Sequence, residues 1–307
     1  MIRITYKGVE VTASVSINRC IHDMWAAGRS DTLDICFNDA ENLWDRWEPQ
    51  VGDEIRVDYG TVSTGTMFVR TAAPENGLFA IRAMSAPPSA MEITNKAWRK
   101  VRFLQIGQEI AQRHGLAFKS YDVPDRLYEY ILQAGESDFA FLHRRAVLEG
   151  CAFLVYDKTL ILYNVASMES AEALETLTVP LDGEYRYSDA RGRLYGSCIV
   201  ESGAYKGEFS AGNGATRVLR PGNLGNIGSS NEAARYAKGL LRAANQDDRT
   251  GWVRTRGVLT GYAAASVVNL RNGRAPSWDG PAFLYRVRND YGKGVGKLFF
   301  RKPLEGY

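Results

Sequence analysis

Histidine is the residue type with the widest chemical use, and this chain holds three, His22, His114 and His143. None has a carboxylate, histidine or cysteine neighbour at the spacing typical of metal ligands. We therefore predict no metal site, and no motif requires a bound cofactor. One nucleophilic pair stays open, because Cys151 follows His143 on the next predicted element and a histidine can activate a thiol. No asparagine is placed to orient such a pair, so we predict ordinary roles for both residues.

Two pairs of neighbouring carboxylates are candidates for acid–base chemistry. Glu136 and Asp138 flank Ser137, a predicted helix N-cap. The helix dipole favours acidic residues there without any catalytic role. Asp247 and Asp248 follow the end of another predicted helix and indicate a solvated turn. A glycosidase holds two carboxylates across a cleft, and nothing in the sequence pairs these groups in that way.

Two glycine-rich segments resemble phosphate-binding loops only superficially. The loop 222–228 precedes a predicted helix but lacks the Gly-x-Gly-x-x-Gly spacing and a βαβ setting. The segment 292–297 has Tyr291 where a P-loop needs its first glycine and Leu298 where it needs serine or threonine. We predict a loop at the first segment and a hairpin turn between two strands at the second.

The composition is that of a globular protein with two or three domains. The chain has 307 residues, 45% of them hydrophobic, and a net charge of +3, which is too small to indicate a dedicated nucleic-acid or membrane surface. We expect its cysteines to be reduced and buried: Cys20, Cys36, Cys151 and Cys198. The N-terminus alternates like a strand, and no apolar run approaches the ~18–20 residues of a membrane span. We therefore expect synthesis in the cytoplasm without a signal peptide.

The segment 1–88 has the alternation of short antiparallel strands. Apolar and polar residues alternate over 2–6, 9–13, 33–37, 55–59, 66–71 and 78–84. Asn76-Gly77 between two of these runs is a strong hairpin signal. Two prolines, Pro87 and Pro88, cannot continue a central strand, so we place the end of this domain there. Such a set of strands predicts a barrel or sandwich.

The segment 89–165 predicts a small α+β domain. Phe103, Ile106 and Ile110 lie on one helical face, and Gly115 closes that helix. A short strand is predicted within 116–124. A second helix follows the cap at Ser137 and ends at Gly150, and the runs 151–156 and 159–164 then read as a two-stranded hairpin.

The segment 166–307 predicts a second β-rich region with one helix. Strands are predicted over 176–181, 194–202, 216–219, 251–259, 266–270, 282–288 and 297–302. Ser229 and Glu232 have the spacing of a capping box at the start of a helix over about 229–246. The basic stripe Arg235, Lys238 and Arg242 on this helix indicates either a solvated face or a contact face for a polyanion or an acidic protein.

One stretch resembles the signature of a known family. Its matching residues are Gln133, Glu136, Ser137, Asp138, Phe141, Arg144, Glu149, Gly150 and Phe153. They resemble the contractile-tail hub family, which includes phage late control D proteins, baseplate hub proteins and the N-terminal part of type VI secretion spike proteins. The helix over 106–115 and the region 233–289 resemble other parts of the family. Asn289 stands where many members have a histidine.

This resemblance implies an α+β fold that is mostly β. Two tube-type β-barrel domains, 1–88 and 166–307, would flank the small α+β domain 89–165, and the helix near 229–246 would be inserted in the second barrel. Three subunits would form a ring whose six barrels adapt a sixfold tail tube to a threefold spike. The signature is structural, so the resemblance implies no enzyme activity.

The resemblance implies that the chain binds two further copies of itself, a tail tube protein and a separate spike protein. Baseplate wedge or tape-measure components are also expected, and DNA is expected only as channel cargo. The chain ends just after its last predicted strand, so we expect the spike to be a separate polypeptide. That favours the tail baseplate of a phage, a bacteriocin or a phage-like injection particle over type VI secretion. Two alternatives stay open: a tail-associated peptidoglycan hydrolase and a β-rich binding module.

Overall fold

The computed structural model describes residues 2–307, so Met1 of the predicted first strand lies outside the described residues. The first part of the chain is β-rich. Its elements are β1 (Ile2–Tyr6), β2 (Val9–Glu10), η1 (Thr12–Ser14), β3 (Ser16–Trp25), β4 (Thr32–Asn38), α1 (Leu43–Trp47), β5 (Glu54–Tyr59), β6 (Val62–Ser63), β7 (Met67–Glu75), β8 (Leu78–Met84) and η2 (Pro88–Met91). Asn76 and Gly77 both take positive φ and join β7 to β8, which confirms the predicted hairpin.

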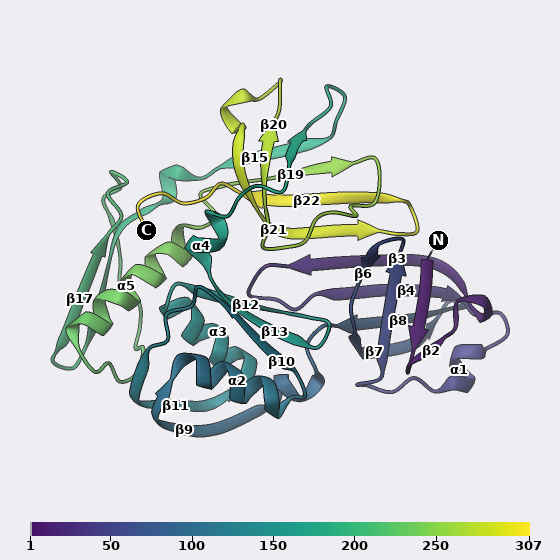
Figure 1. Ribbon diagram of the computed structural model, residues 1–307, viewed down its shortest axis with the longest axis horizontal. Coiled ribbons are helices and arrows are strands. Elements are labelled where there is room, and N and C mark those ends of the chain that lie inside the picture. The colour runs from purple at the N-terminus through teal and green to yellow at the C-terminus, as the bar shows by residue number, and fades with distance from the viewer. Residues whose placement is uncertain (1) are drawn as a thin grey trace.

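The middle of the chain forms a compact α+β unit. Its elements are β9 (Ile93–Arg102), α2 (Phe103–Arg113), β10 (Ala117–Tyr121), β11 (Leu127–Ser137), α3 (Asp138–Leu148), β12 (Cys151–Tyr156), β13 (Thr159–Asn164) and α4 (Val165–Glu169). Figure 1 shows α2 and α3 between the β9–β11 ribbon and the β12–β13 hairpin, and one apolar core joins these layers. Both helices and the hairpin confirm the prediction, whereas β9 and β11 were not predicted.

The last part of the chain contributes to two different sheets. Its elements are β14 (Thr176–Thr178), β15 (Tyr185–Asp189), η3 (Arg191–Arg193), β16 (Tyr195–Ser202), β17 (Tyr205–Ser210), β18 (Arg217–Leu219), α5 (Ser230–Asn245), β19 (Arg249–Thr255), β20 (Val267–Arg271), η4 (Pro276–Trp278), β21 (Gly280–Asp290) and β22 (Val295–Arg301). The predicted helix is α5, capped by Ser229, whose Oγ accepts from the Glu232 amide at 3.2 Å. The segment 292–297 begins with the turn between β21 and β22, so it is the predicted hairpin and not a P-loop.

The two β-rich parts share one continuous sheet of 14 strands. Its main order is β15-β19-β22-β21-β3-β4-β8-β7-β5-β1-β2, and β3 pairs antiparallel with β21, so that Trp25 lies opposite Arg286. No sheet within residues 2–307 closes on itself. The mostly β, α+β class is confirmed, but the two predicted barrels are not closed barrels. To close the first barrel, β3 would have to pair with the strand at the far end of its own half, β1 or β2. It pairs with β21 instead, so the two halves join.

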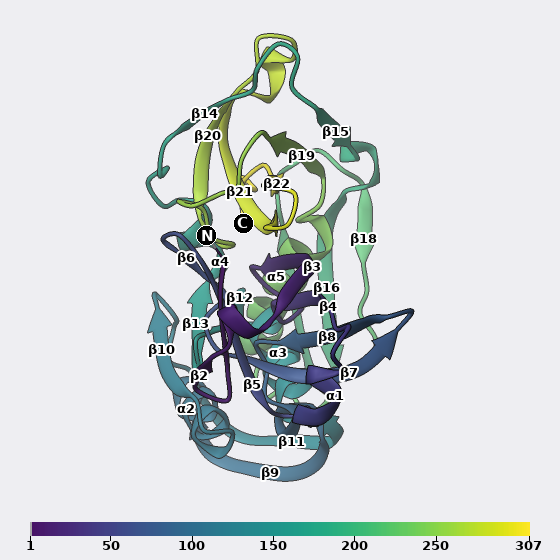
Figure 2. The same ribbon diagram turned by 90° about the vertical axis from the view of Figure 1, so that its right-hand side faces the viewer.

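The strands β16, β17 and β18 form a separate three-stranded sheet that packs against α5. The contact is close, because a Cβ added to Gly207 of β17 would lie 2.0 Å from the backbone nitrogen of Ala234. In Figure 1 this unit lies at the left, beside the α+β unit, and Figure 2 shows β14 and β20 at the end opposite the β9–β11 ribbon. The domain boundaries at residues 88 and 165 stay predictions.

The α+β unit is anchored to the large sheet at two places. At the tip of the β12–β13 hairpin, Asp157 accepts from the backbone nitrogen and the hydroxyl of Thr66, both at 3.0 Å. Near the other end of this hairpin, the Tyr163 hydroxyl donates to the carbonyl oxygen of Ala26 at 2.7 Å. No helix within residues 2–307 is long and apolar enough to cross a membrane.

Candidate functional site

The nine signature residues lie together where β11 passes into α3 and α3 into β12. Gln133 is completely buried near the end of β11, and Ser137 caps α3, its Oγ accepting from the Ala140 amide at 3.2 Å. Phe141 is also completely buried and stacks on Trp98 of β9 with ring centroids 5.9 Å apart. Gly150 takes a φ of +67°, the left-handed conformation that ends a helix. Each of these residues fixes the path of the chain around α3.

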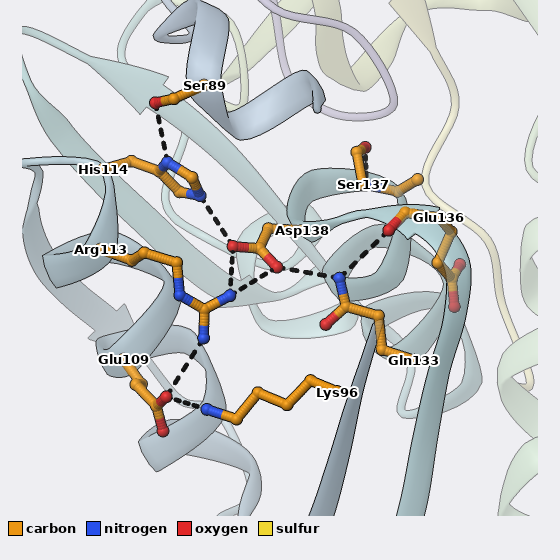
Figure 3. A network of polar contacts seen from close by, with 10 residues as sticks. Ser89, Lys96, Glu109, Arg113, His114, Gln133, Glu136, Ser137 and Asp138 are labelled. Atoms are coloured by element: carbon orange, nitrogen blue, oxygen red, sulfur yellow. Dashed lines mark hydrogen bonds and ion pairs between the residues drawn. The ribbon is translucent and has the colours of Figure 1, made fainter. Parts of the chain in front are cut away.

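Asp138 is the centre of a buried polar network (Figure 3). Arg113 at the end of α2 donates through Nη1 to both carboxylate oxygens, at 2.8 and 2.6 Å. Gln133 Nε2 donates to Oδ1 at 2.9 Å, and Nε2 of His114 lies 2.8 Å from Oδ2. The network therefore joins the end of β11, the end of α2 and the start of α3 through one carboxylate.

The surroundings of Asp138 favour its charged form. Burial alone would raise the pKa of this carboxyl group. The hydrogen bonds from Gln133 and His114, together with the charge of Arg113, outweigh burial and lower that pKa below its ordinary value. A charged carboxylate that is only 2% exposed is stable only where such partners surround it, so the network depends on all of its members.

Ser89, His114 and Asp138 follow one another in the order of a nucleophilic triad. The Ser89 hydroxyl lies 2.9 Å from Nδ1 of His114, whose Nε2 contacts Asp138. Two features oppose catalysis. The charge of Asp138 is already balanced by Arg113, and the Ala90 amide, the natural oxyanion donor beside Ser89, donates to the Pro87 carbonyl at 3.1 Å. None of the three residues lines either of the two large cavities described below. The arrangement is best suited to fixing η2 against α2 and α3.

Two ion pairs hold the flanks of α3. Arg144 Nη2 lies 2.5 Å from Oε1 of Glu136, which ties the helix back to the end of β11. At its other end, Glu149 accepts from the Tyr128 hydroxyl at 2.6 Å and from Arg235 Nε at 2.8 Å. The second pair is the more protected, since the Glu149 side chain is 1% exposed. Glu149 thereby connects the ribbon, α3 and α5.

The predicted basic contact face on α5 does not exist as one exposed surface. Arg242 is buried and contacts Glu169, which also accepts from Arg301 Nε at 2.9 Å. Arg235 is half-buried against Glu149, so of the three residues only Lys238 is exposed. The spacing of three and four residues correctly indicated one helical side. It could not show that carboxylates from other elements cover most of it.

Two cavities of about 640 and 650 Å³ lie between the α+β unit and the large sheet, and both are lined by Trp25, Gly28, Arg29 and His143. Cys151 lines the first cavity together with His143, so the structure brings the open nucleophilic pair to one place. Burial raises the pKa of the Cys151 thiol to about 12, and its sulfur lies 3.5 Å from the Glu149 carbonyl oxygen. The thiol therefore stays protonated near neutral pH, which opposes a thiolate mechanism.

The roles of five residues in the polar contacts around α3 were missed from the sequence: Arg113, His114, Tyr128, Arg145 and Tyr236. The Tyr236 hydroxyl accepts from Arg145 of α3 and links it to α5. A buried Asp at a helix start requires a cation from elsewhere. The Arg113-His114 pair at the end of the preceding helix was therefore a readable signal. Tyr128 carried no such signal, because β11 itself was not predicted.

Comparisons with known proteins show a fold shared with tail proteins. The sequence matches no protein-family model and no curated protein. The 43 kDa tail protein of prophage MuSo2 from Shewanella oneidensis superposes with a TM-score of 0.76 at 13% identity, over 98% of both chains. A tail protein from Neisseria meningitidis MC58 gives a TM-score of 0.74 at 13% identity, over 98% of this chain and 96% of that one.

A third similar structure is a component of the type VI secretion system of E. coli, which is described as structurally similar to the T4 bacteriophage tail proteins gp27 and gp5. It superposes with a TM-score of 0.64 at 13% identity, over 99% of this chain and 78% of that one. At such identities the likeness concerns the fold. The chain therefore has the fold of phage tail and type VI secretion proteins, which confirms the fold relationship predicted from its resemblance to the contractile-tail hub family.

Proposed function

We propose that this chain is the structural hub of a contractile tail or phage-like injection particle. Three copies would form a ring that adapts a sixfold tail tube to a threefold spike. The observation that carries this proposal is the likeness to two phage-type tail proteins over nearly the whole of each chain. The signature residues fit this proposal, because their contacts serve chain folding.

The continuous sheet suits such a ring. One half of the sheet consists of β1–β8, and the other half consists of β14, β15 and β19–β22. The pairing of β3 with β21 joins the two halves, so three chains would supply six half-sheets. The ends of the main strand order are β15 and β2, and edge strands carry unpaired backbone groups that favour pairing with another chain. Joining one end of the sheet to the opposite end of the next copy is a heterologous contact, which closes into a ring at the right rotation.

Under this proposal the chain acts within the tail baseplate. Its partners are a tail tube protein on one side of the ring and a spike protein on the other, with baseplate wedge or tape-measure components around them. The particle would be a phage, a prophage-derived bacteriocin or a related injection device, with DNA present only as channel cargo. The units 1–88, 89–165 and 166–307 would be its domains.

An edge-strand variant with a matched control tests the ring. Val9 in edge strand β2 and Val51 in a turn are equally accessible, at 62% and 65% exposed. We expect Val9→Lys to reduce the trimer fraction in native mass spectrometry at least fivefold, and Val51→Lys to leave it unchanged. A wild-type chain that stays monomeric at high concentration with its tube and spike proteins would favour the β-rich binding module instead.

A second candidate function, hydrolysis of cell-wall material or of esters, has the Ser89–His114–Asp138 series in its favour. A zymogram with peptidoglycan and an assay with a p-nitrophenyl ester would test it. We expect no activity above that of the Ser89→Ala variant, which removes only an exposed hydroxyl. Activity that disappears in this variant would establish the enzyme, whether or not the ring forms.

A further inference from the structure

The cavity of about 640 Å³ lies where the large sheet, α3 and α5 meet. Its volume falls in the range of small-molecule sites in proteins, roughly 300–1,000 Å³. Charged side chains reach it from three separate parts of the chain: Arg29 between β3 and β4, Arg242 of α5 and Arg301 of β22. The contacts that hold the signature residues in place do not explain why these three arginines lie around one cavity.

The cationic groups at this cavity exceed the anionic ones. Arg242 and Arg301 share a single carboxylate, that of Glu169. Arg29 makes no ion pair with any residue in the range 2–307, and its guanidinium lies over the Trp25 ring at 4.8 Å. Three guanidinium groups against the carboxylates of Glu169 and Asp247, which also lines the cavity, leave a formal charge of +1 (3 − 2). One negative charge would balance the site.

Hydrogen-bond donors and acceptors at the cavity are also left without partners. Nε of Arg242 and Nδ1 of His143 are buried and have no hydrogen-bond partner within residues 2–307. The Arg242 side chain is only 8% exposed. A buried polar group without a partner is unfavourable, and a bound ligand would remove this cost. Burial raises the pKa of Tyr285, which also lines the cavity, so its hydroxyl stays protonated and able to donate.

Part of the remaining wall of the cavity is apolar. Trp25, Val147, Ala152 and Val165 supply an aromatic face and aliphatic surface beside the guanidinium groups. Guanidinium groups bind carboxylates through paired, charge-assisted hydrogen bonds. An apolar body of modest size would contact the aliphatic side chains of Val147, Ala152 and Val165 at the same time.

We propose that this cavity binds a monoanion made of a carboxylate on a short apolar body. The arginine side of the cavity, where Arg29 lies over Trp25, would hold the carboxylate, and the aliphatic side chains would contact the apolar part. A free organic acid and the C-terminal carboxylate of a peptide present this same chemistry. The site is independent of ring formation, since every group that forms it belongs to one chain.

Calorimetric titration of the full chain with 3-phenylpropanoate tests the proposal. We expect saturable one-to-one binding, accompanied by a change in Trp fluorescence that is absent in Trp25→Phe. The neutral isostere 3-phenylpropanamide should bind at least tenfold more weakly. Equal binding of acid and amide, or no binding of the acid at millimolar concentration, would overturn the proposal. A phenylalanine-terminated peptide, with a free or an amidated C-terminus, then distinguishes the two sources of the carboxylate.

Variants locate the binding. Arg29 is exposed and forms no ion pair, so Arg29→Gln should fold normally and weaken binding at least fivefold. Arg271→Gln, at an exposed arginine of β20 outside the cavity, is the matched control and should bind like the wild type. Ala243→Phe should fill the cavity and abolish binding, with an unchanged circular-dichroism spectrum as the check on folding. Equal losses in the Arg29 and Arg271 variants would show non-specific attraction and overturn the proposal.

Discussion

Asp138 shows how a residue of the family signature acts at the scale of single side chains. Its carboxylate is buried and charged, and it holds Arg113, His114 and Gln133 in place. A buried charge pair is weak evidence for net stabilisation, because burying it costs hydration. Removing the carboxylate is different, since the completely buried Gln133 and the largely buried His114 side chain then lose their partner. The signature thus marks a set of residues that must be present together.

We predict that Asp138→Asn destabilises the chain by about 3 kcal/mol, since it removes the buried charge that Arg113, His114 and Gln133 contact. The measurement is the midpoint of urea unfolding. Glu109→Gln is the control, because the Glu109 side chain is 41% exposed and its ion pairs with Lys96 and Arg113 should contribute less than about 1 kcal/mol. Equal effects of the two substitutions would contradict the role given to the network.

The same carboxylate predicts a pH dependence. A carboxyl group whose pKa is lower in the folded chain contributes stability that is fully present above its unfolded pKa, about 4, and that is lost as the pH falls through the folded pKa. The stability difference between the wild type and Asp138→Asn should therefore be constant above about pH 5 and shrink below pH 4. A difference that grows on acidification would show that the folded pKa is not lowered.

The sequence predicted only part of this residue-scale arrangement. Ser137 and Gly150 have the predicted conformations because capping and chain reversal depend on a few neighbouring residues. The contact between Asp138 and Arg113 joins residues 25 positions apart, so the sequence could indicate candidate cations for Asp138 but not which of them it contacts. For the same reason the sequence placed Arg242 on a basic stripe and could not indicate Glu169 beside it.

At the scale of elements, the packing of α5 against α3 depends on a glycine inside a helix. A Cβ added to Gly239 would lie 2.4 Å from the Val147 carbonyl oxygen and 2.6 Å from that of Leu148. Alanine is the better helix former by about 1 kcal/mol, so helix propensity alone would favour the substitution. The contact is with backbone atoms at the end of α3, which cannot rotate away, so the clash should dominate.

We therefore predict that Gly239→Ala lowers the free energy of unfolding by about 2 kcal/mol net of its helix propensity. Thermal unfolding followed by circular dichroism measures this change. Gly257→Ala is the control, because no atom lies within 4 Å of its added Cβ and its φ is ordinary, so its effect should stay within about 0.5 kcal/mol. A neutral or stabilising Gly239→Ala would show that α5 can move away from α3.

Two strands of the α+β unit, β9 and β11, were missed from the sequence for one cause. In β9 the buried residues Trp98 and Val101 are three positions apart, and Lys100 between them takes a positive φ. In β11, Tyr128 and Ile131 are likewise three apart. A strand is predicted from alternation with a period of two, so an irregular strand gives no signal. The regular strands β1, β4 and β8 alternate clearly and were predicted.

At the scale of the whole molecule, the pairing of β3 with β21 decides the architecture. Alternation indicates which face of a strand is buried but not which strand lies beside it. Residues 21–25 pair with residues 286–290, more than 250 positions away in sequence. The sequence consequently predicted two separate barrels, whereas the chain forms one continuous sheet with an edge at each end. Because the main strand order ends in an edge strand on each side, β15 and β2, the central claim is that copies join end to end into a ring.

The most direct test of this claim is electron cryo-microscopy of the purified chain mixed with the tail tube and spike proteins of its particle. We predict threefold rings in which each copy contributes two neighbouring half-sheets, so that six surround an axial channel, with the spike bound on one face. Particles that contain only single copies, or a closed assembly in which β15 and β2 both remain exposed, would contradict the claim.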